Sequence, residues 1–350
     1  DVLRDALKRI NRIHTTTGEH LFSEENLSTA MQRLKSVPYS GLLRTNEAVY
    51  DLLTLGTTLE QTIDGDSRGR SLRFIDWQHP LDNSFHVSPE LVVQRSRSQN
   101  TIRCDLVLFV NGIPLAVIEC KAPSVDVGQA VAQLIGYQGE SQAPHLFVMA
   151  QVLLAVNGQH ARVGTVGSPA KFWSTWREDA NDAAIAAMLA QPLPREVQAD
   201  LFELVQRLSG ARAQPGVAED IATYWVTRSV TEQDRTLAAV LSPQRLLALV
   251  FHYTVFDGGI RKVARYQQVR AIDRIMERIQ HWETTPTGAQ RRSGGVVWHT
   301  QGSGKSLTMV MLARRLALQQ GLVNPRIVLV TDRDDLDKQI EGTFKTCGLQ

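Results

Sequence analysis

The sequence has few cysteines and no long apolar segment. Its 350 residues include three cysteines, no two of which have the C-x-x-C spacing of zinc sites and redox motifs: Cys104, Cys120 and Cys347. This usage indicates a reducing compartment, so we expect a cytoplasmic protein without a zinc site. No apolar run approaches the roughly 20 residues that span a bilayer, so we expect no membrane contact.

The net charge is also small. The 38 Lys and Arg residues nearly balance the 36 Asp and Glu residues, which leaves a formal net charge of +2. Contact with nucleic acid would therefore depend on local basic groups such as Arg95, Arg97 and Arg103. No export signal opens the chain, and Asp1 already lies in an expected helix, so we expect residues before Asp1 in the complete protein.

Hydrophobic residues make up 43% of the chain, enough core for two or three domains. Apolar positions at helical spacing predict helices within residues 1–60, as in Asp5–Arg12 and Leu27–Lys35. Residues 70–160 contain short apolar runs, which predict strands at Leu72–Trp77, Leu91–Val93, Asp105–Val110, Leu115–Ile118 and Leu146–Met149. The third and fourth runs do not alternate, which indicates a central sheet that helices cover on both faces.

An Ala- and Leu-rich helical pattern occupies residues 176–250, and we interpret it as a connecting segment. Its breaks are Pro192, Pro194, Pro215 and Gly216. From residue 251 onward the pattern changes again and indicates a third part.

The third part contains a glycine-lysine-serine string, His299–Ser306. An apolar run that predicts a buried strand, Gly295–Trp298, precedes it, and an amphipathic pattern, Leu307–Leu318, follows it. Strand, loop and helix in this order form the phosphate loop of proteins that bind a nucleoside triphosphate. His299 stands where the first glycine usually does, a variation that is usual in helicase-like motors. An ordinary glycine-rich turn is the alternative.

Each residue type in this loop suits a phosphate. Gly302 and Gly304 let main-chain N–H groups turn inward at the helix N-terminus. Lys305 places a charge near the β and γ oxygens, and Ser306 offers its hydroxyl to Mg²⁺. We therefore expect ATP to be bound by Thr300, Gly302, Ser303, Gly304, Lys305 and Ser306.

A second set of chemical groups lies in the predicted sheet, where thirteen residues separate Asp105 from Glu119-Cys120-Lys121. Such a set can form a Mg²⁺-dependent phosphodiesterase site. Asp105, Glu119 and the Cys120 carbonyl would hold the ion, while Lys121 would orient the attacking water. Because strand side chains alternate, Glu119 and Lys121 share a face and Cys120 points to the core. A surface charge pair is the alternative, but burial of these charges beside an apolar strand would be costly without a metal or mutual pairing.

The hairpin between these acids imposes a condition. Asn111-Gly112 is a strong two-residue turn signal, yet a regular hairpin with that turn would place Asp105 opposite Ile118, on the other face from Glu119. An odd-length loop or one bulge restores a shared face. We therefore predict a bulge, for example with Gly112 in the left-handed conformation.

Gln133 and Tyr137 lie four residues apart in a predicted helix that follows Pro123. They share one face of that helix. Their spacing fits contacts to a substrate and packing within the fold equally well.

The residues together resemble the motor and restriction (R) subunit of type I restriction-modification enzymes. The resemblance covers most of the chain: Ile75-Asp-Trp77 with Pro80, Asn83 and Phe85; Leu108–Leu115 running into Val117–Lys121; Gln133-x-x-x-Tyr137; Phe256-Asp257; Ala264–Gln268; Trp298–Ser306; and Val330–Leu336.

The resemblance implies the α/β class, with a restriction-endonuclease-like mixed sheet flanked by helices, a helical connection, and the start of a RecA-like parallel α/β motor. It implies a PD-(D/E)xK nuclease domain over residues 1–175 with Asp105, Glu119 and Lys121 as its catalytic set, followed by the Gln133 and Tyr137 motif. The connection would cover 176–250 and the first part of the motor 251–350. Cys104 stands where the family has proline before the first acid.

The motor resemblance implies an adenine-reading glutamine. Gln268 fits best, because Ala271 follows three residues later, and Gln267 is the alternative. Val328–Asp332 matches two patterns, a strand that ends in a Mg²⁺-holding acid or the next helicase motif, which touches the DNA backbone through residues such as Arg333. We favour the second, because Arg333 rather than Glu follows the acid. We find neither the Mg²⁺-holding acid pair nor the second motor lobe in these residues.

The expected function is ATP-dependent translocation coupled to Mg²⁺-dependent cleavage of unmodified double-stranded DNA. The expected partners are methyltransferase (M) and specificity (S) subunits. A stand-alone helicase-nuclease for DNA repair or phage defence is one alternative. A nuclease-fold DNA clamp that no longer cuts is another, and the retained Asp105, Glu119 and Lys121 argue against it.

Overall fold

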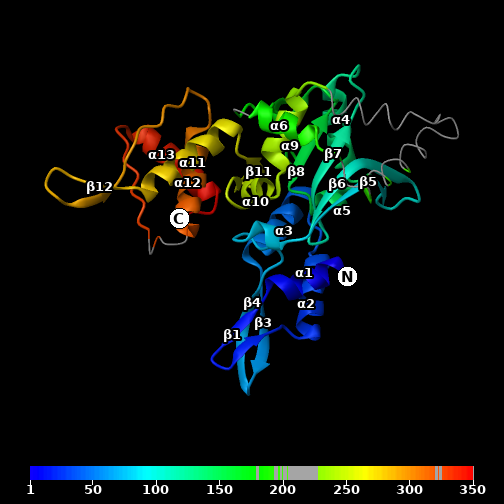
Figure 1. Ribbon diagram of the computed structural model, residues 1–350, viewed down its shortest axis with the longest axis horizontal. Coiled ribbons are helices and arrows are strands. Elements are labelled where there is room, and N and C mark those ends of the chain that lie inside the picture. Colours follow the sequence, from blue (N-terminus) through cyan, green and yellow to red (C-terminus); the bar gives the residue numbers. More distant parts are fainter. Residues whose placement is uncertain are drawn as a thin grey trace.

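The computed structural model describes residues 1–178, 181–192, 228–319 and 325–349, together with residues 196, 197, 199, 203 and 322. Figure 1 shows a narrow N-terminal lobe, a central sheet with its helices, and a C-terminal region on the far side of the connecting helices. None of the helices in the described ranges is both long and apolar enough to cross a membrane.

The N-terminal lobe confirms the helical interpretation of the first 60 residues and adds two hairpins. Its helix α2 begins after Ser23, whose hydroxyl accepts a hydrogen bond from the Asn26 N–H and so satisfies one of the free donors of the first turn. The elements are α1 (Val2–Ile10), β1 (Ile13–Thr15), β2 (Gly18–His20), α2 (Glu24–Lys35), α3 (Leu42–Leu55), β3 (Thr57–Ile63) and β4 (Asp66–Leu72).

The central sheet has five strands in chain order, and it is mixed because β7 and β8 are parallel while the other neighbours are antiparallel. Helix α4 covers one face, where Val131 and Leu134 pack against Val117 and Leu153. The other face belongs to a second apolar cluster, so both faces are covered, as predicted. The elements are η1 (Pro80–Asp82), β5 (Phe85–Gln94), β6 (Thr101–Val110), β7 (Ile113–Cys120), α4 (Val127–Tyr137), α5 (Pro144–Phe147), β8 (Val152–Val156), β9 (Ala161–Gly164) and η2 (Ala170–Phe172).

Two strand predictions are wrong. Within the predicted strand Leu72–Trp77, only Leu72 belongs to a strand, and the rest is an irregular buried segment. Side chains replace the sheet ladder there, because Asn83 accepts from the Asp76 N–H and Asp76 accepts from the two N–H groups that follow Trp77. The run Leu146–Met149 lies in and after the short helix α5, and the strand that follows it, β8, was not predicted. Short buried apolar runs do not distinguish strand from helix.

The turn between β6 and β7 has the predicted two residues. Val110 pairs with Ile113, and Asn111 (φ 53°) and Gly112 (φ 80°) both adopt the left-handed conformation that a tight hairpin turn requires. The side-chain amide of Asn111 donates to the Phe74 carbonyl, which ties the turn to the irregular segment.

The predicted bulge is confirmed, but it lies at Leu115 rather than at Gly112. The register shifts between Leu108 and Phe109, where Leu115 is the extra residue on β7. Its carbonyl accepts a hydrogen bond from the Gln151 N–H at the start of β8, so the group displaced from the hairpin ladder is satisfied by the next strand.

The described part of the connecting segment is mainly helical, with α6 (Asp182–Leu189), α9 (Glu232–Leu241) and α10 (Pro243–Phe251). Helix α9 begins with a capping box between Thr231 and Asp234. The predicted break at Pro192 falls just after α6, whereas those at Pro194, Pro215 and Gly216 lie outside the described residues.

The C-terminal region contains two hairpins and three helices among its described residues: β10 (Thr254–Asp257), β11 (Ile260–Val263), α11 (Tyr266–Gln280), β12 (Trp282–Thr284), β13 (Gln290–Arg292), α12 (Lys305–Leu318) and α13 (Asp334–Thr346). The predicted strand Gly295–Trp298 belongs to no sheet among the described residues, and neither does Val328–Asp332, for which a strand was the less favoured of two interpretations. No described strand lies beside either segment, so neither has the ladder partner that defines a strand. The helix predicted after the loop is confirmed as α12.

Candidate functional site

The sheet brings Asp105 and the Glu119–Lys121 triplet together. Asp105 lies in β6, Glu119 and Cys120 end β7, and the bulge shifts the register so that the two acids face each other across the hairpin. The Cys120 N–H donates to the Asp105 carboxylate at 2.7 Å. The structure therefore assembles the three predicted side chains at one end of the hairpin.

Glu119 is almost fully buried, with 1% of its surface exposed. One carboxylate oxygen, Oε1, accepts from the Lys121 ammonium at 2.7 Å, while Oε2 is buried without a partner among the described residues. Burial raises the pKa of Glu119 to about 7; the ammonium of Lys121 lowers it and the nearby charge of Asp105 raises it. A buried, unpartnered carboxylate oxygen is costly unless a cation or a proton neutralises it.

The predicted helix motif closes the site from one side. Lys121 donates to Gln133 Oε1 at 2.7 Å, and the Gln133 amide donates to the Tyr137 hydroxyl. Tyr137 in turn donates to the Arg103 carbonyl at 3.2 Å. Asp126 caps the N-terminus of this helix, α4. Gln133 thus contacts the lysine directly, and Tyr137 contacts Gln133 while its ring also packs against the apolar cluster beneath α4.

The donor set fits a hard divalent cation. Asp105 and Glu119 offer carboxylate oxygens, the ligand type that Mg²⁺ and Mn²⁺ prefer. The unpartnered Oε2 of Glu119 is the atom that such an ion would satisfy. The Cys120 thiol packs against an apolar cluster, and burial raises its pKa to about 12, so it stays a neutral core side chain, as predicted.

The phosphate loop precedes α12 with the expected backbone. Gly302 (φ 75°) and Gly304 (φ 84°) are left-handed, and Gly304 caps the helix that begins at Lys305. The Lys305 ammonium donates to the carbonyls of His299 and Thr300, each at 3.1 Å, so the lysine folds back over the loop. Ser303 donates to the Thr300 carbonyl at 2.7 Å, while Ser306 lies half-buried in the first turn of α12.

Gln268 is in direct contact with this loop. Its amide donates to the Gly304 carbonyl at 3.1 Å and its oxygen accepts from the Arg265 N–H at 2.9 Å. A Cβ at Gly304 would meet the flexible Gln268 amide nitrogen at 2.8 Å, and the φ of 84° favours glycine at this position. The structure thus brings Gln268 to the loop, whereas the side-chain oxygen of Gln267 is buried without a partner in the described part of the chain.

The phosphate loop and the carboxylate–lysine site lie in different regions of the molecule (Figure 1). Arg333 belongs to neither and is the exposed N-cap of α13.

A buried arginine that the sequence patterns do not single out joins the two regions. Arg261 of β11 is 2% exposed and donates to Asn46 of α3 and to Thr165 after β9. Its guanidinium also lies 5.1 Å from the centre of the Tyr50 ring. Arg314 of α12 contacts the same ring. No sequence signal indicates this contact, because β11 reads Ile-Arg-Lys-Val and its Ile260 is exposed while Arg261 is buried.

The fold and the two sites define a two-part α/β protein, a mixed-sheet domain with a carboxylate–lysine cluster followed by a phosphate-loop region. Comparison with known proteins indicates which family the chain resembles. Residues 1–172 match the family model described as type I restriction enzyme R protein N terminus, and residues 267–350 match the SWI2/SNF2 ATPase model. These matches support the N-terminal part of a type I restriction enzyme R subunit.

Individual relatives agree. The chain is 29% identical over 347 residues to the type I restriction enzyme HindI endonuclease subunit of Haemophilus influenzae, a match that covers 98% of this chain and 28% of the relative. It is 25% identical over 303 residues to a putative type I restriction enzyme MjaIXP endonuclease subunit of Methanocaldococcus jannaschii. That match covers 85% of this chain and 26% of the relative. The chain spans about a quarter of the length of the curated relatives that it matches.

Proposed function

We propose that the complete protein is the motor and restriction subunit of a type I restriction enzyme. It uses ATP to move along double-stranded DNA and cuts unmodified DNA away from the recognition site. Its partners are the methyltransferase and specificity subunits, and it acts in the cytoplasm. The relatives are named as endonuclease subunits of such enzymes, which supports this role.

One observation carries the nuclease assignment. Glu119 is buried beside Asp105 with one carboxylate oxygen unpartnered and the other bound to Lys121, an arrangement that folding alone does not favour. Asp105 and Glu119 would hold Mg²⁺, which would stabilise charge at the scissile phosphate. Lys121 orients the attacking water, and Gln133 and Tyr137 hold Lys121 and contact the DNA near the cleaved bond.

The phosphate loop supports the proposal that the C-terminal part binds ATP. Lys305 and Ser306 engage the phosphates and Mg²⁺, Gln268 reads the adenine, and Arg333 contacts the DNA backbone. We propose domain bounds of 1–175 for the nuclease, 176–250 for the connection and 251–350 for the first part of the motor.

The nuclease assignment is tested by substitution in the complete protein with its partner subunits. Asp105→Ala, Glu119→Ala and Lys121→Ala each lower the cleavage rate by at least about 10², because each removes a metal ligand or the charge stabiliser. DNA-stimulated ATP hydrolysis stays near wild type. Asp66→Ala, on the exposed β3–β4 hairpin, is the matched control and leaves both rates unchanged. Cleavage at a tenth of the wild-type rate or better removes the substituted residue from its assigned role.

The motor assignment predicts that a substitution in the phosphate loop abolishes ATP hydrolysis as well as cleavage. Lys305→Ala abolishes ATP hydrolysis, translocation and distant cleavage together, because it removes the side-chain cation at the β/γ-phosphates. Lys35→Ala, exposed on α2, is the control. Distant cleavage that persists in Lys305→Ala shows that cutting does not depend on translocation and favours a stand-alone repair nuclease.

A further inference from the structure

The turn between β5 and β6 carries two arginines whose charge is not neutralised. Neither Arg95 nor Arg97 forms an ion pair with a carboxylate within the described residues, and the Arg95 Nε is buried there without a hydrogen-bond partner. The nearby acid, Glu140, accepts instead from the Tyr39 hydroxyl at 2.6 Å. We call residues 95–100 the arginine turn.

Groups that donate hydrogen bonds surround these arginines. The arginine turn borders a cavity of about 870 Å³ that Ser96, Ser98, Ser141 and His145 also line. The lining also includes apolar surface and the acid Glu140, but its arginine, hydroxyl and amide groups are of the kinds that contact nucleic-acid phosphates. These groups can therefore bind phosphates of a nucleic acid.

The turn is held firmly. The Ser96 N–H donates to the Gln142 carbonyl at 2.7 Å, and the Arg95 N–H donates to the Asn100 carbonyl at 2.8 Å. Arg97 has a φ of 54°, a strained conformation for a residue other than glycine. Such strain is concentrated at functional sites. A fixed turn places its charges without the entropy cost that a mobile loop would incur on binding.

The arginine turn continues the strand that carries the candidate nuclease site. Four residues of β6, Thr101–Cys104, lie between Asn100 and Asp105, and the five residue steps span roughly 17 Å at strand spacing. At about 3.4 Å of duplex per base pair this is on the order of five base pairs. Gln142, which holds the turn, follows α4, the helix that carries Gln133 and Tyr137.

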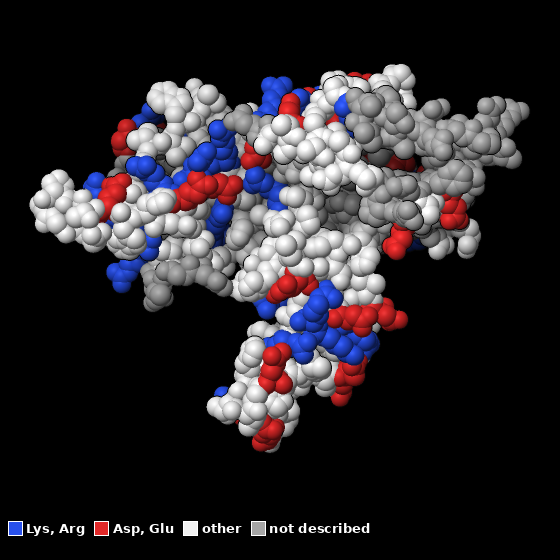
Figure 2. All heavy atoms as spheres, in the orientation of Figure 1, with Lys and Arg blue, Asp and Glu red and all other residues white. Residues whose placement is uncertain are grey.

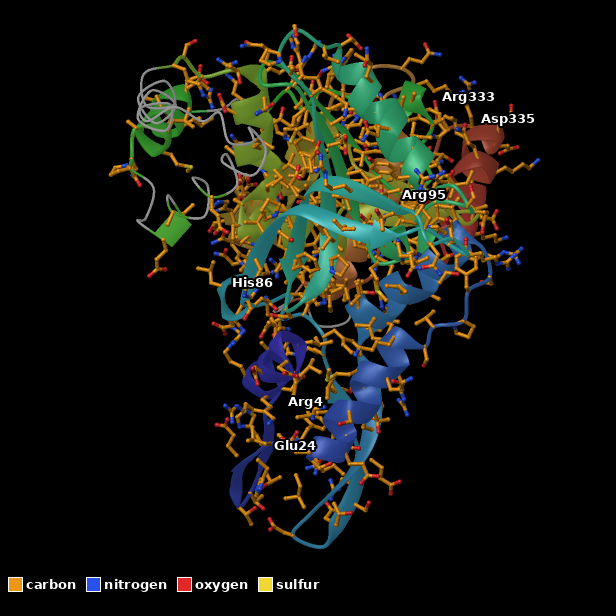
Figure 3. The ribbon with its side chains drawn as sticks, turned by 90° about the vertical axis from the view of Figure 1, so that its right-hand side faces the viewer. Arg4, Glu24, His86, Arg95, Arg333 and Asp335 are labelled. Atoms are coloured by element: carbon orange, nitrogen blue, oxygen red, sulfur yellow. The ribbon has the colours of Figure 1, made fainter. Side chains whose placement is uncertain are left out.

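The turn also faces the same side of the molecule as the motor residue Arg333. Figure 3 shows Arg95 and Arg333 toward the same edge of that view, which is the side turned away from the reader in Figures 1 and 2. The face visible in Figure 2 carries Lys and Arg mixed with Asp and Glu over the N-terminal lobe and the C-terminal region.

We propose that the arginine turn binds the phosphate backbone of the duplex about five base pairs from the phosphate cleaved at Asp105 and Glu119. Arg95 and Arg97 supply the charge, and DNA that passes Arg333 on the motor reaches the nuclease site along this side. This inference rests on the proposed function, because it takes double-stranded DNA as the substrate.

The test uses the complete protein in the Asp105→Ala background, so that DNA binding is measured without cleavage. Binding to a fluorescent duplex is followed as the salt concentration changes, for Arg95→Ala/Arg97→Ala and for Arg95→Lys/Arg97→Lys. Each phosphate contact contributes about 0.9 to the slope of log affinity against log salt. We expect the alanine pair to lower the slope by about two and weaken binding at least tenfold, while the lysine pair keeps both values because it keeps the charge.

Arg68→Ala, exposed on the β3–β4 hairpin, is the matched control and leaves slope and affinity unchanged. An unchanged slope in the alanine pair overturns the proposal, as does a lysine pair that loses as much as the alanine pair. With Asp105 restored, the alanine pair slows cleavage and leaves ATP hydrolysis within about twofold of wild type at saturating DNA. Binding is measured without divalent metal ions, so the DNA stays intact and the assay remains decisive even if Asp105 proves not to be catalytic.

Discussion

At the scale of single residues, Glu119 is the side chain whose state most depends on its surroundings. Burial holds the pKa of its carboxyl at about 7, well above the ordinary 4.5. Because the folded pKa is raised, this group favours the metal-free fold below pH 4.5, and that contribution is lost as the pH rises through about 7. The ionised form, which a metal requires, becomes abundant only above about pH 7.

Metal affinity therefore depends on pH. We expect Mn²⁺ to bind about thirtyfold more weakly at about pH 5.5 than at about pH 8, because only a few per cent of Glu119 is ionised at the lower value. Calorimetric titration of the wild-type protein measures this, and Glu119→Gln removes most of the pH dependence together with most of the affinity. Equal affinity at both pH values would show that Glu119 does not hold the metal.

At the scale of elements, the β6–β7 hairpin sets the geometry of the site, and Asn111 is the residue that fixes its turn. It is fully buried, and its side chain donates to the carbonyl of Phe74 and to the side chain of Asn83 while accepting from the Ser84 N–H. Its backbone is left-handed. Both the side-chain bonds and the tolerance of Asn for this conformation stabilise the turn.

Two substitutions separate these effects. Asn111→Gly keeps the left-handed backbone but loses the side-chain bonds, at a cost of about 2–3 kcal/mol in the free energy of unfolding. Asn111→Ala loses the bonds and adds about 1 kcal/mol or more of backbone strain. Denaturant unfolding measures both. If the two variants are equally stable, the conformation of Asn111 carries no strain and the side-chain bonds alone explain its effect.

At the scale of the whole molecule, the C-terminal region contacts α3 and the end of the sheet through a buried arginine side chain, that of Arg261. Burial lowers its pKa to about 9, so the fold disfavours its charge at neutral pH. No carboxylate pairs with it in the described ranges, and its ring contacts are Tyr50 and Phe256. Burial of an unpaired charge costs several kcal/mol, more than the roughly 2 kcal/mol of a desolvated cation–π contact.

Arg261→Met should therefore be at least as stable as wild type, because methionine fills much of the space without the charge. Arg261→Ala should be less stable by about 2 kcal/mol, because it leaves a cavity between the two regions. Thermal and denaturant unfolding of the complete protein measure both. A loss of more than about 1 kcal/mol in Arg261→Met would mean that the hydrogen bonds and ring contacts outweigh the cost of desolvation.

A second prediction at this scale concerns ATP hydrolysis and metal binding by residues 1–350 alone. Phosphoryl transfer also needs a Mg²⁺-holding acid pair and an arginine from a second motor lobe, and we assign no residue of this sequence to either role. We expect residues 1–350 to hydrolyse ATP no faster than background but to bind Mn²⁺, with binding weakened by Asp105→Ala. Robust ATP turnover would identify Asp332 as the Mg²⁺-holding acid after all.

The candidate site could be predicted largely from the sequence because its chemistry is local. The phosphate-loop helix follows from one continuous string, and the need for a bulge follows from counting residues between Asp105 and Glu119. The bulge itself lies at Leu115, because its carbonyl finds a partner in Gln151 at the start of β8, a strand that the sequence pattern did not reveal.

Other features depend on neighbours that are distant in the chain. The apolar run Leu146–Met149 is typical of a strand, yet it lies in and after the helix α5. The run Val328–Asp332 also has a strand-like pattern, yet no described strand lies beside it. Glu119 is buried, and Arg261 contacts the rings of Tyr50 and Phe256, because segments that are distant in the chain pack together. The sequence by itself determined which groups can do chemistry, because residue type and short spacing are local. Only the tertiary structure decided how they are paired, buried and charged, because water is excluded from them only when distant segments meet.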